Sequence, residues 1–229
     1  MLKKISNIGD CGIACDFGDE ISKDTNKEVI KFFSFVQDSA KAKKIKGILN
    51  CTPSYNKLII NFDLEKIKSS ELIQFIQKSD YSKITLPEKN KLIEIPICYD
   101  EEFALDIKTL EQKTKLNFKE ITKEHLKTDF FVYMIGFVPG HPFMGDLNKK
   151  LYLNRLETPR VRVPKGSVGI VEKFCNIYTF DSPGGWNIIG KTPLELFNIN
   201  KKNPSILSPG DSVQFKSITK KELLSFKNE

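Results

Sequence analysis

Glycine and proline are distributed very unevenly along this chain, and that distribution constrains its fold more than any other feature of the sequence. Residues 1–135 contain 4 glycines and 3 prolines, whereas residues 136–210 contain 9 and 8. Because these residues interrupt helices and form tight turns, the first part predicts long regular elements and the second predicts short strands joined by turns. A chain of 229 residues is long enough for two domains with separate cores.

The first part of the chain alternates between strand and helix patterns. Its apolar residues predict strands at 12–17, 46–50, 57–62 and 91–97, and amphipathic helices at 26–44 and 69–79. The resulting order, β-α-β-β-α-β, is typical of a ferredoxin-like split βαβ unit.

The second part, which follows a helical connector at about 104–127, has the pattern of a small β-barrel or sandwich. Its candidate strands are "FFVYMI", "RVRV", "SVGIV", "NIYTF" and "DSVQFKSI", separated by Pro/Gly turns. The segment "TPLELF" predicts one helix, with Thr192 as N-cap and Glu195 completing a capping box. The sequence thus predicts an α+β protein with two domains, 1–90 and 91–229.

Charge and cysteine content exclude several classes of function. The net charge is +7, but the lysines are scattered among 29 acidic residues, which indicates a solvated surface and no nucleic-acid-binding stripe. No segment is long and apolar enough to span a membrane, and the start, "MLKKISNIGD", lacks a signal-peptide pattern, so we expect a cytoplasmic protein. The five cysteines predict free thiols, and their spacing does not match a zinc site, so we expect no metal.

The three arginines lie within residues 155–162, although the chain has 36 basic residues in total. Arginine differs from lysine in its planar fork, which binds a carboxylate or phosphate through two parallel hydrogen bonds. On a strand, Arg160 and Arg162 would share one face about 6.6 Å apart, with Lys165 in the following turn. These residues predict an anion-binding site; the alternative is an exposed basic face on a half-buried strand.

The loop "GFVPGHPFMGDL" (136–147) contains His141, one of two histidines. Its glycine spacing resembles a phosphate-binding loop, but Asp146 occupies the position of the required lysine, which excludes that interpretation. A metal site would need further ligands that nothing nearby supplies. Two interpretations remain equal: a turn in which His141 is incidental, or a pocket loop in which His141 offers a hydrogen bond or proton to a small substrate.

The segment "DSPGGW" (181–186) predicts a type II turn with Gly184 at its third position. A hairpin packed beside the single tryptophan is the favoured interpretation of this segment. The functional alternative is an anion-accepting nest formed by the Ser182 hydroxyl and the backbone amides of Gly184 and Gly185. No Ser-His-Asp arrangement is indicated, because G-x-S-x-G is absent, and the catalytic residues stay unassigned.

Four longer segments carry a family resemblance: "VYMIGFVPGHPFMGDL", "RLETPRVRVPKGSVGI", "SPGGWNIIGKTPLELF" and "LSPGDSVQF". Weaker matches lie at 15–21, 53–63 and 94–107, so the resemblance covers nearly the whole chain. The chain resembles the carboxyltransferase-domain family that contains the 5-oxoprolinase B subunit, allophanate hydrolase subunit 1 and the sporulation kinase A inhibitor. This resemblance implies an N-terminal ferredoxin-like-type α/β domain followed by a C-terminal cyclophilin-like β-barrel.

The resemblance also implies a function. The chain would be the B subunit of an ATP-dependent 5-oxoprolinase, which converts 5-oxo-L-proline to L-glutamate together with partner subunits of the A and C types. ATP with Mg²⁺ would be shared with a partner subunit. Arg160, Arg162 and Lys165 would hold an anion. The alternatives are a regulatory protein that inhibits a sensor histidine kinase, or a subunit of an allophanate hydrolase or urea carboxylase system.

The sequence departs from the family pattern at three places in the second part. His141 stands where relatives usually carry an aromatic residue, and Gly145-Asp146 stands where they usually carry two glycines. The third place is 174–176, "FCN", where they usually carry Gln-Thr-Gly. Glutamine and threonine offer hydrogen-bonding groups that phenylalanine lacks. These departures predict an altered substrate preference or weaker catalysis.

Overall fold

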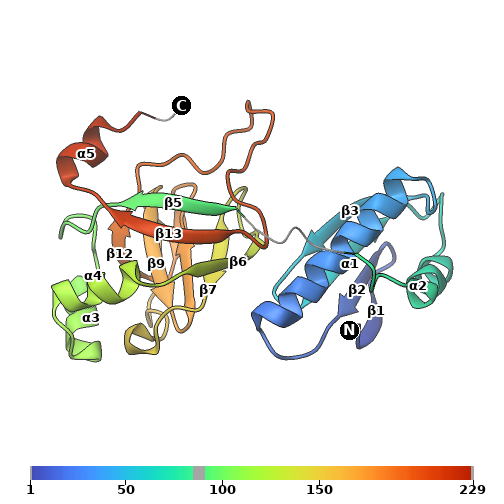
Figure 1. Ribbon diagram of the computed structural model, residues 1–229, viewed down its shortest axis with the longest axis horizontal. Coiled ribbons are helices and arrows are strands. Elements are labelled where there is room, and N and C mark those ends of the chain that lie inside the picture. The colour runs from blue at the N-terminus through green and yellow to red at the C-terminus, as the bar shows by residue number, and fades with distance from the viewer. Residues whose placement is uncertain (1, 85–90, 228–229) are drawn as a thin grey trace. The chain divides into compact units, whose positions relative to one another are not determined.

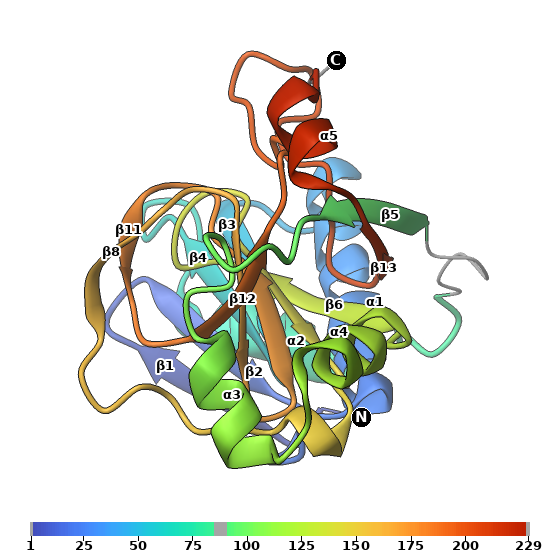
Figure 2. The same cartoon turned by 90° about the vertical axis from the view of Figure 1, so that its left-hand side faces the viewer.

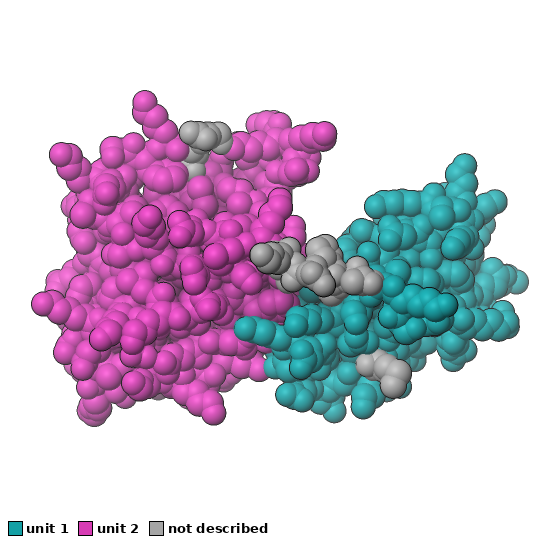
Figure 3. Space-filling view, in the orientation of Figure 1, with its two compact units in different colours: residues 1–89 teal, residues 90–229 magenta. Residues whose placement is uncertain are grey.

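The computed structural model describes residues 2–84 and 91–227. The chain forms two compact units, Met1–Lys89 and Asn90–Glu229, which Figure 3 distinguishes by colour. Each unit contains its own cluster of buried apolar residues. The two units therefore fold around separate cores.

The first unit is a four-stranded antiparallel sheet with two helices. The sheet order is β1-β2-β4-β3, and its elements are β1 (Lys4–Ile8), β2 (Gly12–Asp16), α1 (Lys23–Lys41), β3 (Ile48–Pro53), β4 (Lys57–Phe62) and α2 (Ser69–Lys78). Helix α1 begins after Ser22, whose side chain accepts a hydrogen bond from the Thr25 amide. Its residues Val29, Phe32 and Val36 repeat at helical spacing and are fully buried in the core of the unit.

The predicted ferredoxin-like order is wrong at its fourth strand. Strand β5 (Leu92–Ile97) belongs to the second unit, where it pairs in parallel with β13 (Ser212–Ser217), from the far end of the chain (Figure 1). The edge position beside β2 is occupied by β1, which no expected element covered. A three-residue turn joins β1 to β2, with Gly9 at φ +58°, so this pairing closes only a short loop.

The second unit is a seven-stranded sheet that closes almost completely into a barrel. The order is β12-β9-β10-β7-β6-β13-β5, and the strands not yet given are β6 (Phe130–Ile135), β7 (Pro142–Gly145), β9 (Ser167–Val171), β10 (Phe174–Ile177) and β12 (Asn187–Lys191). At the seam, Cys98 after β5 exchanges two backbone hydrogen bonds with Lys191, of 2.8 and 2.9 Å. Helices α3 (Ile107–Thr114) and α4 (Phe118–Leu126) lie together against the barrel (Figure 2).

Alternation along the strands creates an inner and an outer apolar layer. Val168 and Ile170 of β9 belong to the main core, as do Cys175 and Ile177 of β10. A second, smaller cluster contains Val163, Val171, Tyr178, Trp186 and Ile188. It joins the outer face of the barrel to a two-stranded ribbon of β8 (Arg160–Val163) and β11 (Ser182–Gly184). The candidate site lies at this outer layer.

Two local expectations in the second part are corrected by the structure. Residues 192–196 form no helix: the Thr192 side chain accepts a hydrogen bond from the Leu194 amide, two residues on, and Leu196 is buried. The Leu196 carbonyl pairs with the Ile206 amide, a tertiary contact that outweighs the weak tendency of six residues to form a helix. Gly184 lies in β11 opposite Arg160 and is not among the glycines with positive φ, so the expected type II turn is absent there.

The strands expected from "FFVYMI", "RVRV", "SVGIV", "NIYTF" and "DSVQFKSI" are present, with boundary shifts of a few residues. Across residues 2–84 and 91–227, no helix combines the length and apolar character needed to cross a membrane. All five cysteines are free thiols. Two other helical elements complete the described chain, the single turn η1 (Lys149–Leu151) and α5 (Lys220–Ser225).

Candidate functional site

A pocket of about 270 Å³ lies on the second unit, beside the β8–β11 ribbon. Four separate parts of the chain line it: the β6–β7 loop, the segment just before β8, the end of β10, and the turn from β11 to β12. The residues that matter chemically are His141, Arg155, Asn176, Tyr178, Gly184, Gly185 and Trp186. The most buried polar residues of this lining are His141 and Asn176, both 1% exposed.

The β6–β7 loop owes its many glycines and prolines to a very tight chain reversal. The Gly136 amide donates to the His141 carbonyl, and the His141 amide donates to the Val138 carbonyl. Gly140 has φ +71°, and a Cβ there would lie 2.5 Å from the Phe197 Cβ, so only glycine fits. This reversal places the His141 ring among aromatic rings, 5.0 Å from Phe143 and 5.2 Å from Tyr178 between centroids.

Strand β10 places Asn176 against His141. Because Cys175 and Ile177 face the barrel interior, Asn176 faces the outer layer. Its side-chain nitrogen donates to His141 Nε2 at 3.1 Å. Gly169, its partner residue on β9, leaves room for this arrangement: a Cβ at Gly169 would lie 2.8 Å from Asn176 Oδ1 and 2.9 Å from the Trp186 Cβ.

The His141–Asn176 pair is electrically neutral. Burial disfavours the imidazolium and lowers the pKa of His141 to about 4. Since Nε2 accepts from the Asn176 amide nitrogen, the ring proton lies on Nδ1. His141 Nδ1 and Asn176 Oδ1 have no hydrogen-bond partner among the residues described. Buried polar atoms of this kind cost roughly 1–3 kcal/mol each when unpaired, so each calls for a partner such as a ligand or a water molecule.

Arg155 is the cation of this pocket. Its guanidinium carbon lies 5.7 Å from the centroid of the Trp186 ring. Within the described parts of the chain no carboxylate forms an ion pair with it, in contrast to Arg160 and Arg162. Burial raises the pKa of Tyr178, against smaller lowering effects that include hydrogen bonds and the two nearby guanidinium charges. Tyr178 is therefore a neutral phenol at pH 7.

Arg160 and Arg162 are each engaged by a different carboxylate of the chain. Arg160 donates two hydrogen bonds, of 3.0 and 2.6 Å, to Asp106, which is 5% exposed and also accepts from the Ile188 amide. Arg162 is bound to Asp181. Each fork is thus paired with a different carboxylate of the chain, and the anion-binding role of the two arginines stays a prediction.

The remaining expected site residues are divided between two environments. Lys165 pairs through its ammonium with Glu195 at 3.2 Å and donates its backbone amide to Asp181 at 2.7 Å. Gly184 and Gly185 do line the pocket with His141. Ser182 does not line the pocket itself but directly precedes Pro183, which does. The buried hydroxyl oxygen of Ser182 has no hydrogen-bond partner among the described residues.

Four residues of the site, Arg155, Asn176, Tyr178 and Trp186, were not predicted from the sequence as site residues. Arg155 is one of the three clustered arginines, and Asn176 lies in a segment that departs from the family pattern, so each carried some signal. The sequence could not indicate which arginine lacks a carboxylate partner, because Asp106 and Asp181 are distant along the chain.

The other histidine, His125, lies inside the barrel core and does not activate Cys175. The thiol is 3.6 Å from His125 Nε2, and the Tyr99 hydroxyl is 2.7 Å from Nδ1. Burial raises the pKa of Cys175 well above its usual value and lowers the pKa of His125 to about 3. A thiolate nucleophile needs the opposite shift, so we assign this trio to the core.

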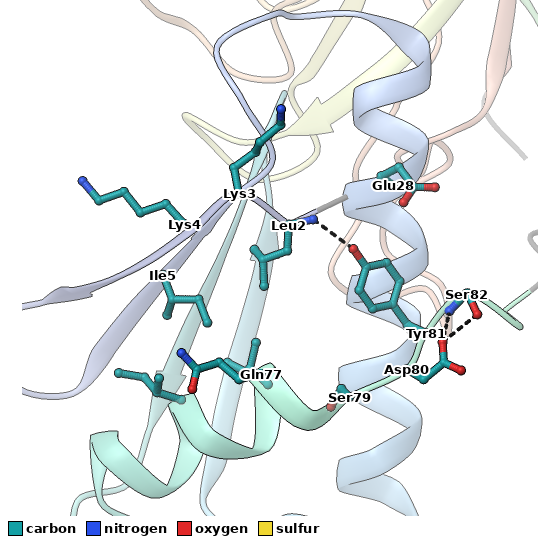
Figure 4. A pocket seen from close by; sticks show the side chains of 12 residues that line it. Leu2, Lys3, Lys4, Ile5, Glu28, Gln77, Ser79, Asp80, Tyr81 and Ser82 are labelled. Carbon is teal, nitrogen blue, oxygen red and sulfur yellow. Dashed lines mark hydrogen bonds between the residues drawn. The ribbon is translucent and has the colours of Figure 1, made fainter.

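A larger pocket, of about 530 Å³, lies in the first unit (Figure 4). Its lining includes Ile5, Ile73 and Ile76, with Lys4 among the polar residues around them. Tyr81 closes one side, where its hydroxyl accepts a hydrogen bond from the Leu2 amide at 3.1 Å. In the described residues, none of the buried polar atoms that lack a partner lines this pocket, so the smaller pocket is the better candidate. No described group of three or more His, Cys, Asp or Glu residues could hold a metal ion.

A known protein family matches most of the chain. The family model for the carboxyltransferase domain, subdomain C and D, matches residues 3–207, and the chain belongs to this family. The family resemblance seen in the sequence is confirmed.

Curated relatives extend over most of the chain. The 5-oxoprolinase B subunit of Bacillus subtilis is 29% identical, over 99% of this chain and 97% of its own length. Its namesake from Escherichia coli O157:H7 is 31% identical, over 74% and 78%. A more distant relative, the urea amidolyase of Lachancea kluyveri, is 23% identical, and the match covers 12% of its length.

Among solved structures, TTHA0988 superposes with a TM-score of 0.81 at 26% identity, over 90% of this chain. The match covers 40% of TTHA0988, so this chain spans less than half of that protein. The fold described above therefore also occurs as one part of a longer polypeptide.

Proposed function

We propose that this chain is the B subunit of an ATP-dependent 5-oxoprolinase, which converts 5-oxo-L-proline to L-glutamate together with partner subunits of the A and C types. The observation that carries the proposal is similarity over nearly the full chain to proteins named as B subunits of 5-oxoprolinase. The pocket supports it, because its neutral polar floor and aromatic walls suit a small uncharged amide group.

In this proposal the chain contributes binding and orientation. The reaction adds water across the ring C–N bond, and ATP would supply the phosphoryl group that activates the amide oxygen. The aromatic residues Phe143, Tyr178 and Trp186 would exclude bulk water from the ring. His141 and Asn176 would hold the amide group at the floor.

We place ATP and Mg²⁺ mainly on a partner subunit. A triphosphate with its metal ion requires several positive or metal-ligating groups. Arg155 is the one cationic side chain in the described pocket lining, and no described carboxylate cluster could hold a metal. The chain's own share of the nucleotide site would be small, which fits a subunit that is inactive alone.

A second candidate is a subunit of an allophanate hydrolase or urea carboxylase system. The relation to urea amidolyase favours it. Ureido substrates also present a neutral amide, which the same pocket floor could bind. This candidate differs from the first in the substrate that stimulates ATP hydrolysis.

The test is reconstitution. The chain is co-expressed with A-type and C-type partner subunits, and ADP and glutamate are measured with and without 5-oxoproline. We expect ATP hydrolysis that depends on 5-oxoproline and on the presence of this chain. Stimulation by urea or allophanate alone would favour the second candidate. A purified complex that responds to none of these compounds, while the chain binds a histidine kinase, would refute both and support a regulatory protein.

A further inference from the structure

Similarity to relatives does not explain three features of the pocket: an arginine in cation–π contact with tryptophan, a buried donor without a partner, and a buried acceptor without a partner in the described chain. We propose that they bind a cyclic amide carboxylate in one orientation, with Arg155 on the carboxylate and the His141–Asn176 pair on the ring amide. This inference rests on the proposed function and assigns its substrate-specificity residues.

Arg155 is available to a carboxylate. Its guanidinium carbon lies 5.7 Å from the centroid of the Trp186 ring, and a cation–π contact of this kind does not occupy the N–H groups along the edge of the guanidinium. Those edge groups are the ones that bind a carboxylate through two parallel hydrogen bonds. Arg160 and Arg162 already direct theirs at Asp106 and Asp181, whereas no carboxylate in the described residues pairs with Arg155.

The floor of the pocket is complementary to an amide and to no charged group. His141 offers one N–H donor at Nδ1, and Asn176 offers one carbonyl acceptor at Oδ1. A carboxylate has only acceptors and an ammonium has only donors, so neither matches both positions. An amide matches both, and in a five-membered lactam the ring holds the C=O and N–H on the same side.

The same arrangement discriminates between substrate and product. Opening the ring replaces the neutral amide by a carboxylate and an ammonium group, which the ring no longer holds side by side and which carry charge into a buried, neutral floor. An unpaired buried donor or acceptor weakens binding strongly. Both atoms lie beneath the pocket surface, so binding includes a side-chain adjustment of the aromatic lining, of which Phe137 is the most exposed member at 64%.

The experiment measures binding by calorimetry on the complex with the partner subunits, without ATP, for three ligands. The ligands are 5-oxoproline, 2-pyrrolidinone, which lacks the carboxylate, and 3-oxocyclopentanecarboxylate, which lacks the amide N–H. Arg155→Gln is expected to weaken 5-oxoproline about 10- to 100-fold and to leave 2-pyrrolidinone unchanged. In the wild type, the ketone is expected to bind at least about 10-fold more weakly than 5-oxoproline.

Two variants control for charge and folding. Lys216→Gln removes a positive charge outside the pocket lining and is expected to change none of the three affinities. Arg155→Lys keeps the charge without the fork and is expected to recover only part of the lost affinity. The inference is overturned if the Arg155→Gln variant keeps full affinity for 5-oxoproline, or if its affinities for 5-oxoproline and 2-pyrrolidinone fall equally. It is also overturned if the ketone binds to the wild type as tightly as 5-oxoproline. A wild-type complex that binds neither lactam overturns the proposed function as well. The two failures can be distinguished, because failure of the inference alone leaves the binding of 5-oxoproline to the wild type intact.

Discussion

Replacing Arg160 by methionine distinguishes a structural from a substrate-binding role for the arginines of strand β8. The Arg160 fork makes two hydrogen bonds to Asp106, whose carboxylate also accepts the Ile188 amide at 2.7 Å. Asp106 is the N-cap residue of α3, and Ile188 lies in β12. Arg160 thus ties the ribbon to the barrel through one buried carboxylate.

The expected cost follows from the burial of the two partners. Breaking a buried ion pair by removing one member costs about 3–5 kcal/mol, because a charge stays buried without compensation. Asp106 is 5% exposed but the Arg160 side chain is 28% exposed, so water can replace part of the lost contact. We therefore expect a loss of about 3 kcal/mol in the free energy of unfolding of the second unit.

The assay is urea unfolding followed by tryptophan fluorescence, since the single tryptophan, Trp186, reports on this unit alone. Arg162→Met is the matched control: its pair with Asp181 is 77% and 40% exposed, and such pairs contribute at most about 1 kcal/mol. In the double variant with Asp106→Leu, much of the loss from Arg160→Met should be recovered. An Arg160→Met protein with the wild-type urea midpoint but without affinity for 5-oxoproline would refute this reasoning and restore the anion-binding prediction.

The histidines and glycines give two further predictions. Burial holds the pKa of His125 at about 3 and that of His141 at about 4, below about 6.5 in the unfolded chain, so the unfolded state binds more protons as the pH falls. Stability should therefore drop by about 4 kcal/mol between pH 7 and pH 5, and an unchanged urea midpoint would contradict this. Gly184→Ala places a Cβ 2.1 Å from the Tyr178 hydroxyl oxygen and should cost about 1–3 kcal/mol, whereas Gly185→Ala, with its nearest atom at 3.6 Å, should be tolerated in the same assay.

Local patterns in the sequence predicted local structure well and long-range pairing poorly. The strand at 167–171 could be foreseen from its composition, because a short apolar run with β-branched residues between two turns favours a strand. The partner of the strand at 92–97 could not be foreseen, since its parallel neighbour lies more than a hundred residues later. The helix expected at Thr192 failed for the same reason: its residues satisfy their hydrogen bonds with segments distant in the chain.

The site was predictable only in part, because burial and register define it. His141, Gly184 and Gly185 stood out in the sequence through loop composition, and they do share a pocket. The importance of Asn176 depends on its facing the outer layer while both neighbours face the barrel interior. A shift of register by one residue in β10 would bury its amide in an apolar core and expose Cys175 to the pocket.

The clustered arginines of this lysine-rich chain make different contacts from one another, and the anion-binding role of Arg160 and Arg162 stays a prediction. At Arg160 the two-pronged fork is used on the chain's own Asp106, and at Arg155 the guanidinium carbon lies 5.7 Å from the centroid of the Trp186 ring. Lysine cannot replace the first function, because an ammonium has no fork. Both side chains converge on the region of Tyr178, one stabilising the ribbon that forms the pocket wall and the other facing the pocket itself. The composition therefore drew attention to the arginines, but only the fold determines which of them has no carboxylate partner among the described residues.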